Sequence, residues 1–156
     1  IPGCGNAHEA NYLAELGFQD ITLIDYAPLL VEQLKEKFAQ KTAIKVIESD
    51  FFELNGQYDL IVEQTFFCAI SPELRQRYAK KMYDLLKPQA KLVGLLFNRT
   101  FEQQGPPFGG CTEEYLAYFL PYFHIKTFEN SYNSISPRAN TEIFMILQRK
   151  SETQLK

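Results

Sequence analysis

Short apolar runs alternate with helical patterns along almost the whole chain. Runs typical of buried strands lie at 20–25, 44–50, 58–64 and 91–97. Helical patterns lie at 29–38, 72–85 and 112–120. The first helix illustrates the pattern, because Leu30, Leu34 and Phe38 fall on one of its faces. This alternation predicts an α/β fold, in which a doubly wound parallel sheet carries helices on both faces.

The last part of the chain departs from this alternation. The segments 123–130 and 141–150 both have the composition of strands, and no helical pattern separates them. They are predicted to pair as an antiparallel hairpin with a long connection. We therefore expect a single domain over residues 1–150, followed by a polar tail over residues 151–156.

Charge and cysteine content exclude several classes of protein. The net charge of −3 and a pI near 5.5 leave no basic excess for nucleic acid. No apolar run approaches the ~18 residues of a membrane span. Three cysteines without a CxxC pair are typical of reduced thiols, so we expect a cytoplasmic protein. We also expect a monomer.

Residues suited to nucleotide binding lie in a glycine turn at the start of the sequence and at the ends of two predicted strands. Gly3 and Gly5 form a Gly-x-Gly turn ahead of a helical run, and such turns let backbone N–H groups approach a ligand. Asp25 lies 20 residues after Gly5, the spacing at which an acid accepts from ribose hydroxyls. Asp50, Phe51 and Phe52 follow the next strand. The carboxylate can accept from an exocyclic amine, and either ring can flank a purine, although we expect at least one of the two rings to belong to the core. Ligands of such sheets bind at the carboxyl ends of the strands, so together these residues predict an adenosine site.

The glycine spacing discriminates between adenosine cofactors. A dinucleotide fingerprint requires a third glycine three residues after Gly5, and this chain has His8 there. The site is therefore better suited to S-adenosylmethionine, whose amino-acid tail replaces a pyrophosphate. A nicotinamide-dependent oxidoreductase and a non-catalytic S-adenosylmethionine-binding module remain alternatives.

Five segments resemble the thiopurine S-methyltransferase superfamily, in particular plant halide and thiol methyltransferases and their bacterial relatives. They are "PGCGNAHE" (2–9), "YDLIVEQTFFCAISPELR" (58–75), "LLKP" (85–88), "GPPF" (105–108) and "SISPR" (134–138). The resemblance implies a class I methyltransferase (Rossmann-like) fold with strand order 3-2-1-4-5-7-6 and an antiparallel last strand. Family members carry their first strand and a lid before the glycine turn, so we expect this chain to be truncated there.

The resemblance also implies roles for individual residues. The family's cofactor contacts fall on five positions: Gly3, Asp25, Asp50, Phe51 and Gln64. Gln64 stands where plant relatives have Tyr, and Glu63 stands where they have Asp. We expect Glu63 to face the sulfonium or the ammonium group of the cofactor.

Three further residues are candidates for binding the methyl acceptor. Phe97 stands where plant relatives carry a Tyr, which favours a thiol acceptor over a halide, and a halide or thiocyanate remains an alternative acceptor. Phe108 lies in a Pro/Gly loop, which either shapes the acceptor pocket or is an ordinary turn. Arg138 could bind an acceptor carboxylate or remain a solvated side chain. No catalytic acid or base is identified, since in-line methyl transfer depends on orientation. The Cys and His residues lack metal-ligand spacing, so no metal is predicted.

Overall fold

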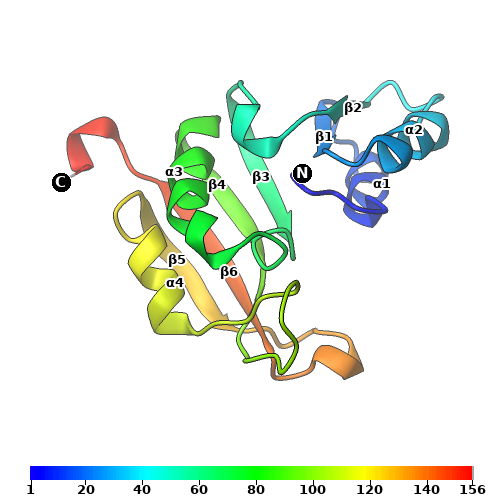
Figure 1. Cartoon of the computed structure of the whole chain (residues 1–156). Helices are drawn as coiled ribbons and strands as arrows, with labels where there is room; N and C mark the ends of the chain where they lie inside the picture. The colour runs from blue at the N-terminus through cyan, green and yellow to red at the C-terminus, as the bar shows by residue number, and fades with distance from the viewer. Residues whose placement is uncertain (156) are drawn as a thin grey trace. The chain divides into compact units, whose positions relative to one another are not determined.

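A computed structural model describes residues 1–155, which gather into two compact units (Figure 1). Unit 1 comprises residues 1–55, and unit 2 begins at Gly56. The single domain expected over residues 1–150 remains a prediction.

Unit 1 is a small α/β layer. Its elements are α1 (His8–Glu15), β1 (Ile21–Asp25), α2 (Pro28–Lys37), β2 (Ile44–Glu48) and the 3₁₀ turn η1 (Phe51–Glu53). Strands β1 and β2 pair in parallel, with Ile21 opposite Ile44 and Asp25 opposite Glu48. Buried side chains from the turn, both helices and both strands pack into one core, which includes Ala10, Leu23 and Leu34. Parallel pairing places the carboxyl ends of β1 and β2 at the same edge.

The first residues of the chain run beside β1. Pro2 forms a parallel bridge with Ile24, and the N–H of Ile24 donates to the carbonyl of Ile1 at 3.2 Å. The N–H of Cys4 then donates to the carbonyl of Ile24 at 3.4 Å. This bridge lies where the family resemblance places the end of the first strand, and it fixes the start of the glycine turn against β1.

Unit 2 contains a four-stranded mixed sheet. Its strands are β3 (Tyr58–Gln64), β4 (Leu86–Phe97), β5 (Phe123–Asn130) and β6 (Glu142–Arg149). Their order is β3-β4-β6-β5, with β3 and β4 parallel and both pairs that involve β6 antiparallel. The predicted terminal hairpin is confirmed. The orders within the two sheets match the two halves of the expected order 3-2-1-4-5-7-6.

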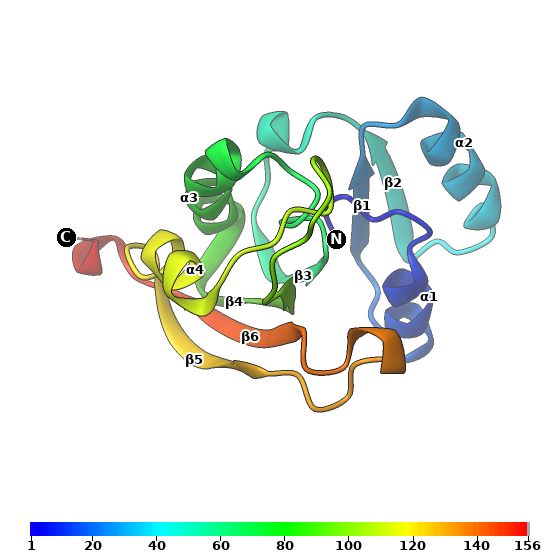
Figure 2. The same ribbon diagram turned by 60° about the horizontal axis from the view of Figure 1, so that its bottom comes forward.

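Both long helices of unit 2 cover the same face of its sheet (Figure 2). They are α3 (Arg75–Leu85), entered through the 3₁₀ turn η2 (Pro72–Leu74), and α4 (Thr112–Phe119). Aromatic rings fill the layer beneath them: the ring of Phe67 lies 5.1 Å from those of Tyr78 and Tyr115 and 5.7 Å from that of Phe119. Two short 3₁₀ turns complete the unit, η3 (Ser136–Arg138) and η4 (Glu152–Gln154).

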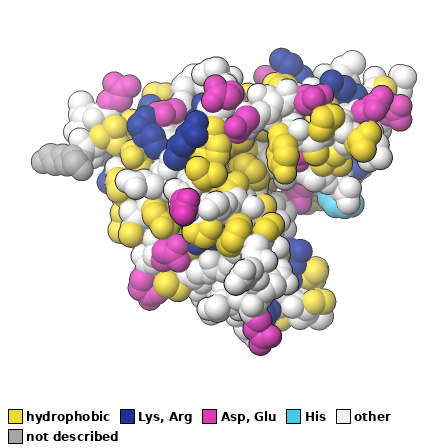
Figure 3. Space-filling view, in the orientation of Figure 1, with side chains coloured by type: hydrophobic (Ala, Val, Ile, Leu, Met, Phe, Trp, Pro, Cys, Tyr) yellow, Lys and Arg dark blue, Asp and Glu magenta, His cyan; other side chains and the backbone are white. Residues whose placement is uncertain are grey.

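The surface carries charges of both signs. On the face drawn in Figure 3, Lys and Arg side chains lie among acidic ones. Lys80 pairs with Asp84, and Lys87 pairs with Asp59 at 2.8 Å. Within residues 1–155, no helix combines the length and apolar character needed to cross a bilayer.

Candidate functional site

The carboxylate of Asp25 joins the glycine turn to the end of β1. Gly3 and Gly5 adopt φ values of 53° and 48°, a left-handed conformation that glycine tolerates without strain. The N–H of Gly5 donates to Oδ2 of Asp25 at 3.4 Å, and the N–H of Ala27 donates to Oδ1 at 3.1 Å. Asp25 thereby orders the turn before the first helix and the entry into α2.

Asp50 and Phe51 occupy the equivalent place after β2. Oδ1 of Asp50 accepts from the N–H of Phe52 at 2.8 Å and caps the turn η1. Phe51 is buried, and its ring meets that of the half-buried Phe52 edge to face, with centroids 5.3 Å apart. The expectation that at least one of these rings belongs to the core is therefore confirmed.

These groups of unit 1 keep hydrogen-bonding capacity for a ligand. A carboxylate offers about four lone-pair sites, and the hydrogen bonds of Asp25 within residues 1–155 occupy two of them. Asp50 is exposed and Asp25 half-buried, so both carboxylates remain accessible. The arrangement fits a ligand that carries paired hydroxyls and a ring, which are the recognition features of adenosine.

Glu63 lies in different surroundings, inside unit 2. It is fully buried at the end of β3, where Oε1 accepts from the N–H of Phe67 at 3.1 Å and Oε2 accepts from the hydroxyl of Tyr78. Burial raises the pKa of Glu63 to about 7. Oε1 thus holds the segment that follows β3, and Oε2 connects β3 to α3. A contact between Glu63 and the cofactor remains a prediction, and these hydrogen bonds do not support it.

Gln64, the next residue, is half-buried at the tip of β3. Its side chain makes no hydrogen bond within the part of the chain that the structure describes. Thr65 follows with a φ of 63°, an unusual value for a β-branched residue, so the chain turns sharply away from the strand. Gln64 therefore keeps both its amide donor and its carbonyl acceptor available.

The structure brings two of the three acceptor candidates together. Phe97 is 8% exposed at the end of β4, and the guanidinium of Arg138 lies 5.3 Å from the centre of its ring. Arg138 also pairs with the buried Glu142, with Nη1 3.3 Å from Oε1, so its charge is already balanced. The ring of Phe101 packs edge to face against that of Phe97, with the ring centroids 5.2 Å apart.

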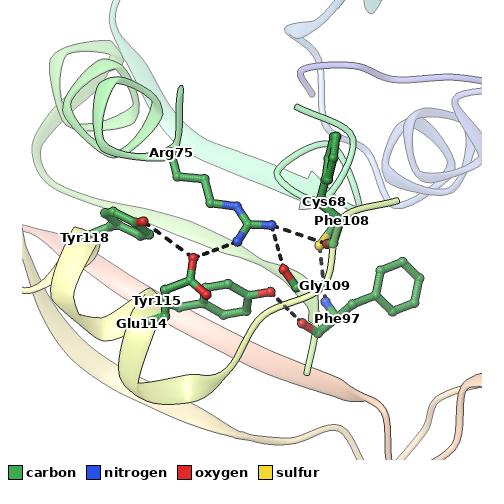
Figure 4. Close-up of polar contacts among 8 residues, drawn as sticks. All are labelled: Cys68, Arg75, Phe97, Phe108, Gly109, Glu114, Tyr115 and Tyr118. Atoms are coloured by element: carbon green, nitrogen blue, oxygen red, sulfur yellow. Dashed lines mark hydrogen bonds and ion pairs between the residues drawn. The ribbon is translucent and has the colours of Figure 1, made fainter. Parts of the chain in front are cut away.

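Phe108, the third candidate, is linked to Phe97 through Cys68. The N–H of Phe108 donates to the carbonyl of Cys68 at 2.6 Å, and the N–H of Phe97 donates to the sulfur of Cys68 at 3.3 Å (Figure 4). All three acceptor candidates thus belong to connected segments of unit 2. Burial raises the pKa of Cys68 to about 12, so this sulfur remains a thiol that accepts a hydrogen bond.

The sequence did not identify the buried Arg75, which supports this region, or its half-buried partner Glu114. A signal was available, because Arg75 precedes Tyr78 by three residues and so shares the buried face of α3. The helical pattern at 72–85 also includes Leu74, which lies in the preceding 3₁₀ turn. Because an arginine is seldom buried, its position on the buried face of the helix did not mark it as a core residue.

The remaining polar groups offer little for other chemistry. Burial raises the pKa of Cys4 to about 11, which leaves it a poor nucleophile. Within residues 1–155, no three His, Cys, Asp or Glu side chains are grouped closely enough to hold a metal ion.

Comparison with known proteins identifies the family. A sequence model of thiopurine S-methyltransferase matches residues 1–152. The chain belongs to the thiopurine S-methyltransferase family. Thiocyanate methyltransferase 1 of Brassica oleracea is 31% identical over 148 residues, with 91% of this chain and 65% of that protein covered. Probable thiol methyltransferase 2 of Arabidopsis thaliana is 30% identical with the same coverage.

The chain thus spans 65% of the length of these two relatives. Solved structures confirm the fold. A SAM-dependent methyltransferase from Methanosarcina mazei superimposes with a TM-score of 0.77 at 21% identity, over 97% of this chain and 91% of that one. A TehB-like SAM-dependent methyltransferase from Corynebacterium glutamicum gives a TM-score of 0.74 at 15% identity, over 96% and 78% of the two chains. The predicted Rossmann-like methyltransferase fold and family are therefore confirmed.

Proposed function

We propose that this thiopurine S-methyltransferase family member transfers a methyl group from S-adenosylmethionine to the sulfur of a small thiol. One observation carries the cofactor assignment. The Asp25 carboxylate is fixed beside the glycine turn by two backbone N–H groups and keeps lone pairs for the ribose hydroxyls. Gly3 and Gly5 present the turn's backbone to the methionine end, while Asp50 and Phe51 contact adenine. Gln64 is a further proposed cofactor contact.

The proposed acceptor residues lie in unit 2. Phe97 and Phe108 supply apolar surface, and Arg138 supplies a cation that stacks on Phe97. A thiol with an aromatic or aliphatic body can bury apolar surface against these rings. The curated relatives named above are thiocyanate and thiol methyltransferases, which supports a sulfur nucleophile. A carboxylate on the acceptor would compete with Glu142 for Arg138.

The reaction requires orientation more than proton transfer. Bound S-adenosylmethionine supplies a methyl group on a positively charged sulfur. The acceptor thiolate forms a new S–C bond as the old one breaks, and the bond's electron pair stays on the departing S-adenosylhomocysteine. The thiol loses its proton to solvent beforehand; at an ordinary pKa near 8.5, a few per cent is ionised at neutral pH. Unit 2 contributes apolar walls that exclude water and align the sulfur.

The proposal is tested with the purified protein and a panel of acceptors. The panel contains aromatic and aliphatic thiols, a thiopurine, iodide and thiocyanate, and the readout is S-adenosylhomocysteine. We expect release that depends on a thiol. Binding of S-adenosylmethionine without release for any acceptor would indicate a binding module. Tighter binding of a nicotinamide cofactor in parallel calorimetry would indicate an oxidoreductase instead.

We also propose a cytoplasmic monomer. Cys4, Cys68 and Cys111 are free thiols, which suits a reducing compartment. Analytical ultracentrifugation in the presence and absence of S-adenosylmethionine tests the monomeric state, and a concentration-dependent larger species would contradict it.

A further inference from the structure

Arg75 is a buried cation that joins three segments of unit 2. It is the first residue of α3, and its side chain is 1% exposed. Nη1 donates to Oε1 of Glu114, in the first turn of α4, at 2.8 Å. Nη2 donates to the carbonyls of Gly109 at 2.9 Å and Phe108 at 3.3 Å (Figure 4). One guanidinium therefore connects two helices with the end of the loop 98–111.

Burial alone does not require so many partners. The guanidinium lies 4.8 Å from the ring of Phe67 and 5.3 Å from that of Tyr115, so it is enclosed by aromatic surface. A buried ion pair is often no more stabilising than apolar side chains of the same volume. The specific contribution of Arg75 is orientation, because its planar guanidinium donates in fixed directions and so positions several acceptors at once.

Arg149 provides an internal comparison in the same unit. It is also buried, at 7% exposure, and it stacks on Tyr83 with its guanidinium 4.1 Å from the ring centre. Its Nε donates to the carbonyl of Tyr83 at 3.0 Å. Within the described residues, Arg149 has no hydrogen bond to the loop 98–111. Of the two buried arginines, Arg75 is the one that bonds to this loop.

The loop held by Arg75 ends beside the acceptor candidates. Near its end, the N–H of Gly110 donates to the carbonyl of Arg99 at 3.0 Å, so the two ends of the loop are joined. A Cβ atom at Gly109 would lie 1.8 Å from the same carbonyl oxygen, so the backbone at the two ends of the loop approaches closely. The hydroxyl of Tyr115, which packs on Arg75, donates to the carbonyl of Phe97 at 2.8 Å. Arg75 thus binds the Phe108 carbonyl directly, and it packs on Tyr115, which binds the carbonyl of Phe97.

We propose that Arg75 is a positioning residue for the methyl acceptor. By holding the carbonyls of Phe108 and Gly109, it keeps the loop 98–111 in the conformation that presents Phe108 alongside Phe97. It acts through these residues of unit 2 and is not itself an acceptor contact. The inference rests on the proposed function, in which Phe97 and Phe108 bind the acceptor. Loss of Arg75 should therefore raise the KM for the acceptor and leave cofactor affinity unchanged.

The test compares Arg75→Lys with Arg149→Lys. Lysine keeps the charge and can still pair with Glu114, but its single ammonium cannot also hold both carbonyls in a fixed direction. We expect Arg75→Lys to raise the KM for the best thiol about tenfold, the cost of a lost hydrogen bond to a charged group, with a smaller change in kcat. The Kd for S-adenosylmethionine should stay within about twofold of wild type by calorimetry. Arg149→Lys should change neither constant.

Hydrogen exchange tests the loop independently of turnover. In Arg75→Lys, the backbone amides of Phe108 and Gly110 should exchange faster than in wild type, while Arg149→Lys leaves them unchanged. Unchanged exchange in Arg75→Lys would overturn the proposed anchor. Faster exchange with an unchanged acceptor KM would overturn its role in acceptor binding. If wild type turns over no acceptor, the proposed function fails, and exchange still decides whether Arg75 anchors the loop.

Discussion

In unit 1, the carboxylates of the predicted site bond to backbone N–H groups close by in the fold and remain accessible. Asp25 accepts hydrogen bonds from the N–H groups of Gly5 and Ala27, and Asp50 accepts one from the N–H of Phe52. In unit 2, the carboxylate of Glu63 is sealed between Tyr78 and Phe67. The difference separates two uses of an acid at a strand end: accessible lone pairs suit ligand binding, and a closed hydrogen-bond network fixes the positions of the elements around it.

Two glycines give the largest expected contrast between the units. A Cβ atom at Gly94 would lie 2.2 Å from the carbonyl oxygen of Glu63 across the β3–β4 pair, so Gly94→Ala must push the strands apart. We expect it to lower the free energy of unfolding by roughly 3 kcal/mol or more. Gly5→Ala meets no atom within 4 Å, and its cost is limited to a left-handed φ, about 1–2 kcal/mol. Urea unfolding followed by circular dichroism measures both, and equal losses would remove the contrast.

The comparison also explains what the sequence could reveal. The spacing of Gly5 and Asp25 predicts that they lie together, and the structure joins them by a hydrogen bond; their role in cofactor binding stays a prediction. The partners of Glu63 and Arg75 depend on how α3 and α4 pack. Arg75 and Glu114 are 39 residues apart, and nothing local marks either as half of a pair. For Glu63, strand position alone could not distinguish an acid facing a ligand from one facing a tyrosine.

The buried acid of unit 2 should make stability depend on pH. In the folded protein the pKa of Glu63 is about 7, compared with an ordinary value of 4.5, so between these pH values the folded state binds more protons than the unfolded one. The free energy of unfolding should therefore fall as pH rises from about 4.5 to about 7, by up to roughly 3 kcal/mol. Glu63→Gln keeps an acceptor for Phe67 and cannot ionise.

Urea unfolding of wild type and Glu63→Gln at several pH values isolates this contribution, because other titrating groups are common to both proteins. The substitution should flatten the decline between pH 4.5 and pH 7, the window given by the ordinary and folded pKa values. If the two proteins lose stability in parallel across this window, the carboxylate is charged in the folded state and the sealed network does not control its proton.

The accessible acid of unit 1 should instead control ligand affinity. Asp25→Ala removes the acceptor for the ribose hydroxyls and should weaken S-adenosylmethionine binding by roughly tenfold or more, as expected for a lost hydrogen bond to a charged group. Asp20→Ala provides the matched control, since Asp20 is an exposed acid in the connection before β1. Calorimetry measures both variants. Unchanged affinity in Asp25→Ala would remove Asp25 from the site.

The smallest expected effect concerns the choice of acceptor. The ring of Phe97 has the ring of Phe101 on one side and the Arg138 guanidinium near its face, so the region offers apolar and cationic surface but no hydroxyl from residue 97. A small hydrated anion must give up water here, and an anion buried with too few partners is costly. A thiol with an organic body gains apolar burial instead. Wild type should therefore methylate thiols more efficiently than iodide.

Phe97→Tyr adds one hydroxyl donor and should raise the kcat/KM for iodide relative to that for the best thiol by about threefold to tenfold, the value of one neutral hydrogen bond. Phe101→Tyr is the matched control, because it adds the same hydroxyl to the adjoining ring. A ratio that changes equally in both variants would mean that added polarity anywhere in the cluster favours the anion. A wild-type preference for iodide over every thiol would show that the residue at position 97 does not set the acceptor class, and that Arg138 alone can compensate for the water an anion gives up.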